Sequence, residues 1–289
     1  MSTLELPRMP AAGPLYRRAA LALVPGVGAR RAGELPDIEL LVRDVAVDRE
    51  RLADYDRVCG FPLSDRLPAT YPHIMAFPLA LRLMTAPDFP FPMVGLVHVA
   101  NRITVHRPLD AGERFDLSVR AADLRPHDRG RQLDVVATAS VAGAAVWEDV
   151  STYLSRERAP ERGDRGDRRD RGDRPAPPPA GARWRVQPRV GTGYARVSGD
   201  HNPIHTWRIG ARLLGFPRPI AHGMWSKARC LAALAGRLPD AYTVDVAFKL
   251  PLPLPSTVAF SASPVDGGGW TFALHNASSG KPHLAGSLR

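Results

Sequence analysis

The last third of the chain alternates between two spacings of apolar residues. Over Met224–Ala235, apolar or small residues recur at helical intervals, and Gly236 and Pro239 stand where such a helix would end. From Tyr242 to Leu250 every second residue is apolar, which is typical of a half-buried strand. Turns rich in proline and glycine separate three further predicted strands, Thr257–Ala262, Trp270–Asn276 and His283–Leu288. One helix followed by antiparallel strands predicts a sheet curled around that helix.

The first half of the chain repeats this order. Strands are predicted over Gly95–Val105, Arg114–Ala121, Gln132–Ala142 and Val146–Leu154. An apolar stretch of helical length precedes them and opens at Pro72-His73-Ile74-Met75, which matches Ala221-His222-Gly223-Met224. Two further segments are similar between the copies. Tyr55–Gly60 matches Tyr194–Gly199, and Val97–Ile103 matches Val244–Leu250. We therefore expect two copies of one α+β unit that pair their sheets and so bury edges that would otherwise invite aggregation.

A stretch without large apolar residues separates the two copies. Residues 156–182 are dominated by Arg, Asp, Gly and Pro, and their mixed charge without periodicity predicts a disordered linker. RNA binding and an Arg-Gly-Asp adhesion motif are weaker alternatives, because interleaved aspartates cancel most of the positive charge. The predicted organisation is an N-terminal extension over 1–36 with a helix at 15–24, a first copy over 37–155, the linker 156–182 and a second copy over 183–289.

Charge and composition narrow the class of protein. The 289 residues carry a formal net charge of +10, which suggests affinity for nucleic acid, for nucleotide-like phosphates or for an acidic carrier protein. No apolar run is long enough to span a bilayer. The two cysteines, Cys59 and Cys230, give no spacing for a disulfide framework or a zinc site. We expect a reduced, cytoplasmic protein.

Polar residues concentrate between the predicted elements of the second copy. Asp200 and His205 are separated by Pro203, so they cannot be neighbours on one regular helix; we expect them to converge from a turn that precedes a short helix over 206–214. Gly223 stands at the start of the longer helix, where unpaired backbone amides can stabilise an oxyanion. A carboxylate, an imidazole and a free amide together indicate acid–base chemistry on an enolisable carbonyl compound.

The run Ser198-Gly199-Asp200-His201-Asn202-Pro203-Ile204-His205, followed by Pro219-Ile220-Ala221-His222-Gly223-Met224, resembles the hydratase motif of MaoC-like dehydratases, also called R-specific enoyl-thioester hydratases. The resemblance implies an α+β double hot-dog fold in its two-copy form, with two curved antiparallel sheets each wrapped around a central helix. It also implies reversible addition of water to a trans-2-enoyl thioester, giving a (3R)-3-hydroxyacyl thioester.

The resemblance further assigns roles to single residues. Asp200 and His205 are the expected catalytic acid–base residues, and the amide of Gly223 is the expected oxyanion donor. Residues expected to contact substrate or to hold the motif are Ser198, Asn202, His222 and Met224. For His222, a role in stabilising its own turn explains the residue as well as contact with substrate does. No metal or redox cofactor is expected, although Asp200 and the nearby histidines offer zinc ligands in principle.

The first copy has lost these features. Phe61 stands where Asp200 stands in the second copy, and Ile74 stands where Gly223 does. From Gly60 to His73 is 13 positions, whereas from Gly199 to His222 is 23, so the short helix of the motif is missing. We expect the first copy to be inactive, and we expect the missing segment to leave a groove between the halves for a long acyl chain.

The predicted partners are an acyl-CoA or an acyl carrier protein thioester, with no nucleic acid, and the chain is expected as a monomeric pseudo-dimer or a homodimer. Basic residues close to the motif are candidates for phosphate contacts: Arg196, Arg208, Arg212, Arg218 and Lys227. Two alternatives stay open. A hot-dog thioesterase would place a carboxylate on the central helix, but Met224–Ala235 contains none. A non-catalytic protein that binds an acyl carrier would not need the Asp200/His205 pair.

Overall fold

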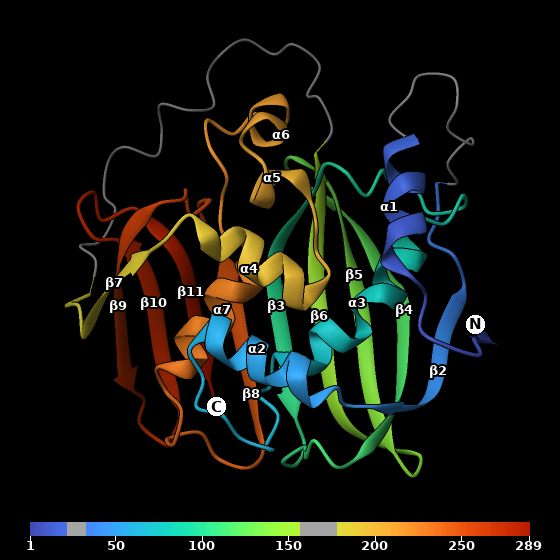
Figure 1. Cartoon of the computed structure of the whole chain (residues 1–289), viewed down its shortest axis with the longest axis horizontal. Helices are drawn as coiled ribbons and strands as arrows, with labels where there is room; N and C mark the ends of the chain where they lie inside the picture. The colour runs from blue at the N-terminus through green and yellow to red at the C-terminus, as the bar shows by residue number, and fades with distance from the viewer. Residues whose placement is uncertain (22–32, 157–177) are drawn as a thin grey trace.

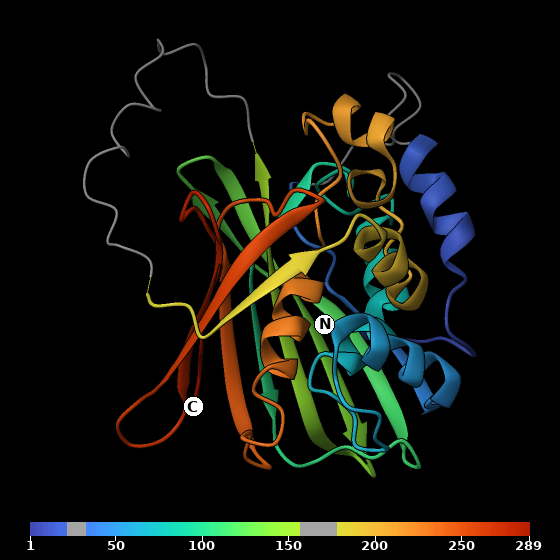
Figure 2. The ribbon, with the colours of Figure 1, turned by 60° about the vertical axis from the view of Figure 1, so that its left-hand side comes forward.

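A single sheet of 11 strands forms the frame of the computed structural model, which describes residues 1–21, 33–156 and 178–289. The strand order is β1-β2-β4-β5-β6-β3-β8-β11-β10-β9-β7. Figures 1 and 2 show the helices gathered on one face of this curved sheet. The two expected sheets are therefore continuous with each other. In the part of the chain that is described, no helix is long and apolar enough to cross a membrane.

The first half contributes the strands β1 to β6 and the central helix α3 (Tyr71–Met84). Pro72 lies in the first turn of α3, where its missing N–H costs nothing, and α3 buries Ile74 and Leu79 completely against the sheet. The four predicted strands are confirmed, and three of them extend further than the pattern indicated. Their bounds are β3 (Leu96–Val105), β4 (Arg114–His127), β5 (Gly130–Val141) and β6 (Ala144–Arg156). Strand β2 (Ile38–Ala46) was not predicted.

The second half contributes β7 to β11 and its central helix α7 (Gly223–Ala232). The bounds of the strands are β7 (Ala182–Val186), β8 (Tyr242–Phe248), β9 (Ser256–Pro264), β10 (Trp270–Asn276) and β11 (Pro282–Leu288). The short helix expected over 206–214 is two helices, α5 (Pro203–Thr206) and α6 (Arg208–Leu213), because Trp207 between them adopts an extended backbone. The predicted linker lies almost wholly outside the described residues.

Two helices that the pattern did not predict explain one of the repeated motifs. Tyr55–Gly60 and Tyr194–Gly199 are the last turns of α2 (Arg49–Cys59) and α4 (Arg189–Ser198) and the glycine that follows each helix. Gly60 and Gly199 both adopt a left-handed backbone, with φ of 81° and 80°, which glycine adopts without steric cost. The rings of Tyr55 and Tyr194 are both buried, with centroids 6.1 Å apart. The repeat therefore marks paired helices at the centre of the molecule.

The N-terminal residues attach to the first half. Strand β1 (Ser2–Glu5) pairs with β2 in parallel, whereas every other strand pair in the sheet is antiparallel. Helix α1 (Ala12–Leu21) covers most of the predicted helix at 15–24 and packs on α3. The boundary at residue 36, like the other domain boundaries, stays a prediction.

The two halves meet where β3 pairs with β8, from Ala100 opposite Ala247 to Val105 opposite Tyr242. Lys227 of α7 reaches this junction. Its side chain is fully buried, and its ammonium nitrogen donates to the backbone oxygen and Oδ1 of Asn101 and to the backbone oxygen of Val244. Burial lowers the pKa of Lys227 to about 7. The expectation that Lys227 contacts phosphate is therefore wrong, because this side chain has no access to solvent.

We predict that Lys227→Met lowers the free energy of unfolding by roughly 1–3 kcal/mol, because it leaves Oδ1 of buried Asn101 without its donor. Denaturant-induced unfolding followed by circular dichroism measures this change. Exposed Lys281→Met is the matched control and should change the unfolding free energy by less than about 0.5 kcal/mol. Equal stability of both variants would show that the junction does not depend on Lys227.

Candidate active site

A cavity of about 830 Å³ opens between the two halves and receives the predicted site residues. The first half lines it with apolar side chains, among them Ile74, Phe77, Met84, Met93 and Leu96, and also with polar ones, among them His73, His98, His127, Asp128 and Arg129. The second half contributes Asp200, His205 and His222. A space between the halves is therefore present, and side chains of both halves border it.

Asp200 follows the end of α4 in a turn held by backbone contacts. Its Oδ1 accepts a hydrogen bond from the amide of Asn202 at 3.1 Å, and its own amide donates to Oγ of Ser198 at 3.1 Å. The side chain is 29% exposed and borders the cavity. Burial opposes ionisation, but the neighbouring histidines and hydrogen-bond donors outweigh it, and the pKa of Asp200 lies below its usual value. Asp200 is therefore a carboxylate at neutral pH.

His205 lies on α5 and has one ring nitrogen fixed by the backbone. Nδ1 lies 2.8 Å from the backbone oxygen of Ile220, and because a carbonyl only accepts, Nδ1 carries the hydrogen of the neutral ring. Burial lowers the pKa of His205 and outweighs the attraction of Asp200. The neutral ring therefore keeps a lone pair on Nε2, so His205 can act as a base.

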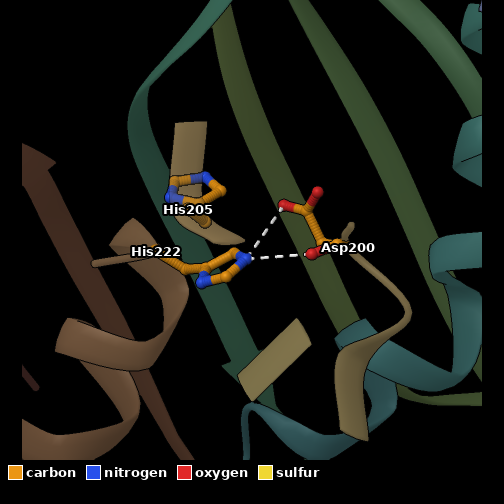
Figure 3. Close-up of side chains that lie close together, drawn as sticks. All are labelled: Asp200, His205 and His222. Atoms are coloured by element: carbon orange, nitrogen blue, oxygen red, sulfur yellow. Dashed lines mark hydrogen bonds and ion pairs between the residues drawn. The ribbon is translucent and has the colours of Figure 1, made fainter. Parts of the chain in front are cut away.

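His222 connects the other two side chains (Figure 3). Its ring stacks on that of His205 with centroids 3.7 Å apart, and its Nε2 lies 3.0 Å from the backbone oxygen and 3.8 Å from Oδ2 of Asp200. Burial lowers the pKa of His222 to about 3, so the ring is neutral and donates through Nε2. This contact pins the turn that carries Asp200, as the turn-stabilising explanation of His222 requires.

Helix α7 begins at Gly223, directly after His222. No side chain caps this helix, so the amides of its first turn have no partner within it. A β-carbon at Gly223 would lie 3.1 Å from the ring of Phe248, which also lines the cavity. The absence of a side chain thus keeps the backbone at the helix start accessible beside Asp200 and His205.

The remaining predicted residues hold the motif together. Ser198 and Asn202 both border the cavity, but their side-chain oxygens accept from the amides of Asp200 and Ile204. Asn202 thus caps α5 and orients Asp200 through its backbone rather than its side chain. Met224 is buried and lines the cavity. Contact of these three residues with substrate stays a prediction.

The corresponding position of the first copy has a different arrangement. His73, the counterpart of His222, pairs through Nδ1 with the buried carboxylate of Asp149. Asp149 also accepts a hydrogen bond from Asn101, whose Oδ1 is bound by Lys227. Residues 60–70 contain no helix, in contrast to α5 and α6 in the second copy. His73 and Asp149 are therefore bound within a hydrogen-bond network that joins the two halves.

The potential ligand atoms of Asp200, His205 and His222 lie within 4.8 Å of one another, close enough for a metal ion. Two ring nitrogens, however, already donate to backbone oxygens, Nδ1 of His205 to Ile220 and Nε2 of His222 to Asp200. Coordination through Nε2 of His222 would break the contact that holds the turn. Nδ1 of His222 is buried and has no hydrogen-bond partner among the described residues, so the expectation that no metal is needed stays a prediction.

Two residues of the site were missed by sequence reasoning. The hydroxyl of Tyr16, in α1, lies 3.3 Å from Oδ1 of Asp200 across 184 positions of sequence, and no local pattern signals such a contact. Gly191 in α4 packs against the backbone of His205, so closely that a β-carbon would lie 2.1 Å from its oxygen. Gly191 lies in α4, a helix that the pattern did not predict, so no local signal identified it either.

The fold and this site define a MaoC-like protein. The sequence matches the MaoC like domain family over residues 177–283, and the chain belongs to the family of MaoC-like dehydratases. It is 38% identical over 272 residues to 3-hydroxyacyl-thioester dehydratase X of Mycobacterium tuberculosis, covering 94% of this chain and 95% of that protein. The crystal structure of HtdX from M. tuberculosis superposes with a TM-score of 0.76 at 37% identity, covering 87% of this chain and 99% of that one. Enoyl-CoA hydratase ChsH3 of M. tuberculosis is 26% identical over 191 residues, 64% of this chain and 66% of that protein.

We predict that Gly191→Ala lowers the free energy of unfolding by at least ~2 kcal/mol, because the new methyl group must displace the backbone of His205. Thermal and denaturant unfolding measure the loss. Gly193→Ala in the same helix is the matched control. Its β-carbon would meet only Val58 at an ordinary 3.7 Å, and the change should stay within about 1 kcal/mol. If both variants are as stable as the parent, α4 does not pack on His205 in this way.

Proposed function

We propose that this chain catalyses the reversible hydration of trans-2-enoyl thioesters to (3R)-3-hydroxyacyl thioesters in the cavity beside Asp200 and His205. The observation that carries the proposal is that an ionised carboxylate, a neutral imidazole with a defined basic nitrogen and an uncapped helix start all border one cavity. The activities named for the M. tuberculosis relatives, thioester dehydration and enoyl-CoA hydration, support this assignment.

In this proposal the pair formed by Asp200 and His205 activates the water molecule and delivers a proton to the substrate. In the hydration direction, the oxygen of water bonds to C3 of the enoyl group while one of its protons passes to the pair formed by Asp200 and His205. A proton from the same pair then bonds to C2, so that the pair ends in its starting state. General acid–base catalysis of this kind contributes roughly 100- to 10,000-fold to rate. Dehydration follows the same steps in reverse.

The start of α7 stabilises the charge that develops on the substrate. When water attacks C3, electron density moves through C2 to the thioester oxygen, which becomes an enolate. The amide of Gly223 is the first of α7, where unpaired N–H groups and the helix dipole favour negative charge. One such donor is worth roughly 100- to 1,000-fold in rate.

The apolar side of the cavity receives the acyl chain in this proposal. A volume of about 830 Å³ falls within the usual size of small-molecule sites, and Ile74, Phe77, Met84, Met93 and Leu96 give its first-half lining an apolar part. Met84 ends α3, some 11 residues beyond His73, which corresponds to ~16 Å along a helix. The chain length of the substrate is then set by the first copy, while the chemistry takes place in the second.

The thioester carrier is coenzyme A or an acyl carrier protein. Arg208, Arg212 and Arg218 are exposed near the motif and suit the phosphates of either carrier. Both cysteines are buried free thiols, which accords with the proposed cytoplasmic setting. The chain is proposed to act as a monomeric pseudo-dimer or as a homodimer.

Thioester hydrolysis is the less favoured reaction for this cavity. Neither central helix, α3 or α7, contains the Asp or Glu that a hot-dog thioesterase was expected to place there. A purely carrier-binding role would leave the ionised Asp200 and the basic nitrogen of His205 without a purpose. Both alternatives give distinct outcomes in the assay below.

We predict that the protein removes the ultraviolet absorbance of trans-2-enoyl-CoA as the double bond is hydrated. Asp200→Asn and His205→Ala should each lower kcat/KM by roughly 100- to 10,000-fold, because each removes one member of the acid–base pair. His106→Gln, on the exposed surface of the first half, should retain the parent activity. Release of free thiol without hydration would indicate a thioesterase, and no turnover with CoA or carrier-protein substrates would indicate a binding protein.

We further predict that Met84→Trp selectively impairs long-chain substrates, because the larger ring fills the remote part of the cavity. The expected loss is at least ~10-fold in kcat/KM for a long acyl chain, with a short-chain substrate turned over nearly as before. Met84→Leu conserves volume and should leave the chain-length profile unchanged. An equal loss for short and long chains in Met84→Trp would place the acyl chain elsewhere.

A further inference from the structure

Helix α1, which sequence analysis left without a role, lies against the turn that carries Asp200. The hydroxyl oxygen of Tyr16 is 3.3 Å from Oδ1 of Asp200 and 3.1 Å from the backbone oxygen of Gly199. The same oxygen accepts a hydrogen bond from the amide of His201 at 2.9 Å. One phenol group thus contacts three consecutive residues, and the middle one is the proposed catalytic carboxylate.

The packing of α1 holds Tyr16 in this position. Its neighbours Leu15 and Ala19 are buried, and α1 packs on α3 of the first half. The ring of Tyr16 also meets that of His201 edge to face, with centroids 6.2 Å apart. Tyr16 therefore reaches the catalytic turn of the second half from a helix that packs on the first half.

The two carboxylate oxygens of Asp200 have different neighbours. Oδ1 lies within hydrogen-bonding distance of two donors, the amide of Asn202 and the hydroxyl of Tyr16. Oδ2 is the oxygen on the side of His222, 3.8 Å from its Nε2. The single hydroxyl hydrogen of Tyr16 can be donated either to Oδ1 of Asp200 or to the oxygen of Gly199. When it is donated to Oδ1, it acts with the amide of Asn202 to fix the rotation of the carboxylate, so that Oδ2 is the atom presented to a reacting water.

We propose that Tyr16 is a positioning residue for Asp200, and that helix α1 of the N-terminal segment thereby completes the active site. This inference rests on the hydratase function proposed above. Tyr16 does not exchange protons with substrate; it holds the carboxylate in one rotamer and stabilises its charge through a hydrogen bond. Burial together with Asp200 raises the pKa of the Tyr16 hydroxyl, which therefore stays protonated and remains a donor.

The test compares Tyr16→Phe with the parent enzyme. We expect kcat for trans-2-enoyl-CoA to fall roughly 10-fold, the effect of losing one hydrogen bond to a charged group, with KM changed less than about twofold. The acid limb of the kcat profile should move to higher pH, because a carboxylate that loses a donor is protonated more readily. Tyr71→Phe removes another tyrosine hydrogen bond, to the backbone of Asp48, and should match the parent in kcat, KM and pH profile.

The shift of the acid limb has to be assigned to Asp200, because other titratable groups face this carboxylate from the surrounding elements. These groups are Tyr16 on α1, Tyr153 on β6, Tyr194 on α4, His201 in the turn, His205 on α5 and His222 before α7. Carbon-13 NMR of labelled aspartate carboxyl groups, with Asp200→Asn to identify the signal, measures the pKa of Asp200 directly and needs no turnover. A higher pKa for Asp200 in Tyr16→Phe is expected.

Two results would overturn the inference. Either Tyr16→Phe matches an active parent in kcat and in the pKa of Asp200, or it raises KM alone, which would mean a role in binding. Failure of the hydratase proposal is recognised separately, since the parent enzyme itself would then not hydrate the substrate. Circular dichroism and thermal unfolding check that Tyr16→Phe is folded. If it is not, Tyr16→Trp, which keeps an aromatic ring but lacks the hydroxyl, takes its place.

Discussion

Six residue pairs between β3 and β8 turn two half-sheets into one, and this pairing fixes where the two central helices lie. Both helices pack on the same face of the joined sheet (Figure 1). The start of α7 and apolar side chains of α3 therefore border one cavity. The chain of contacts from Lys227 through Asn101 and Asp149 to His73 crosses this junction and is almost wholly buried. Because buried polar groups cost free energy unless they are paired, this network stabilises one relative placement of the halves over others.

The same placement gives the equivalent histidines of the two copies different partners. His73 pairs with Asp149, whereas His222 holds the turn of Asp200. Phe61 stands where Asp200 does, and residues 60–70 contain no helix that corresponds to α5 and α6. The first copy is therefore expected to lack the acid–base pair, while its side chains still border the cavity.

Local patterns in the sequence were sufficient for β3 to β6 and β8 to β11, for the central helices, and for bringing Asp200, His205 and Gly223 to one cavity, but β1, β2 and β7 were not predicted. These features depend on periodicity, on turn residues and on a motif that spans about thirty positions. Long-range contacts could not be predicted in this way. Tyr16 meets Asp200 only because α1 packs on α3, and Lys227 was mistaken for a surface charge because its partners lie 126 and 17 positions away. A buried lysine and an exposed one look alike in sequence; only the packing distinguishes them.

The proposed chemistry depends on keeping Asp200 ionised and His205 neutral in the same partly buried space. Burial keeps His205 neutral, because it lowers the pKa of the ring and outweighs both the attraction of Asp200 and the hydrogen bond to Ile220, which favour the protonated ring. The oxygen of Ile220 fixes the tautomer, since it holds the hydrogen of His205 on Nδ1. The amide of Asn202 stabilises the charge of Asp200 and helps to offset the desolvation of that carboxylate. These partners are present before any substrate binds, so the protonation states are set in advance by the fold, and Tyr16 extends the same principle to the orientation of the carboxylate.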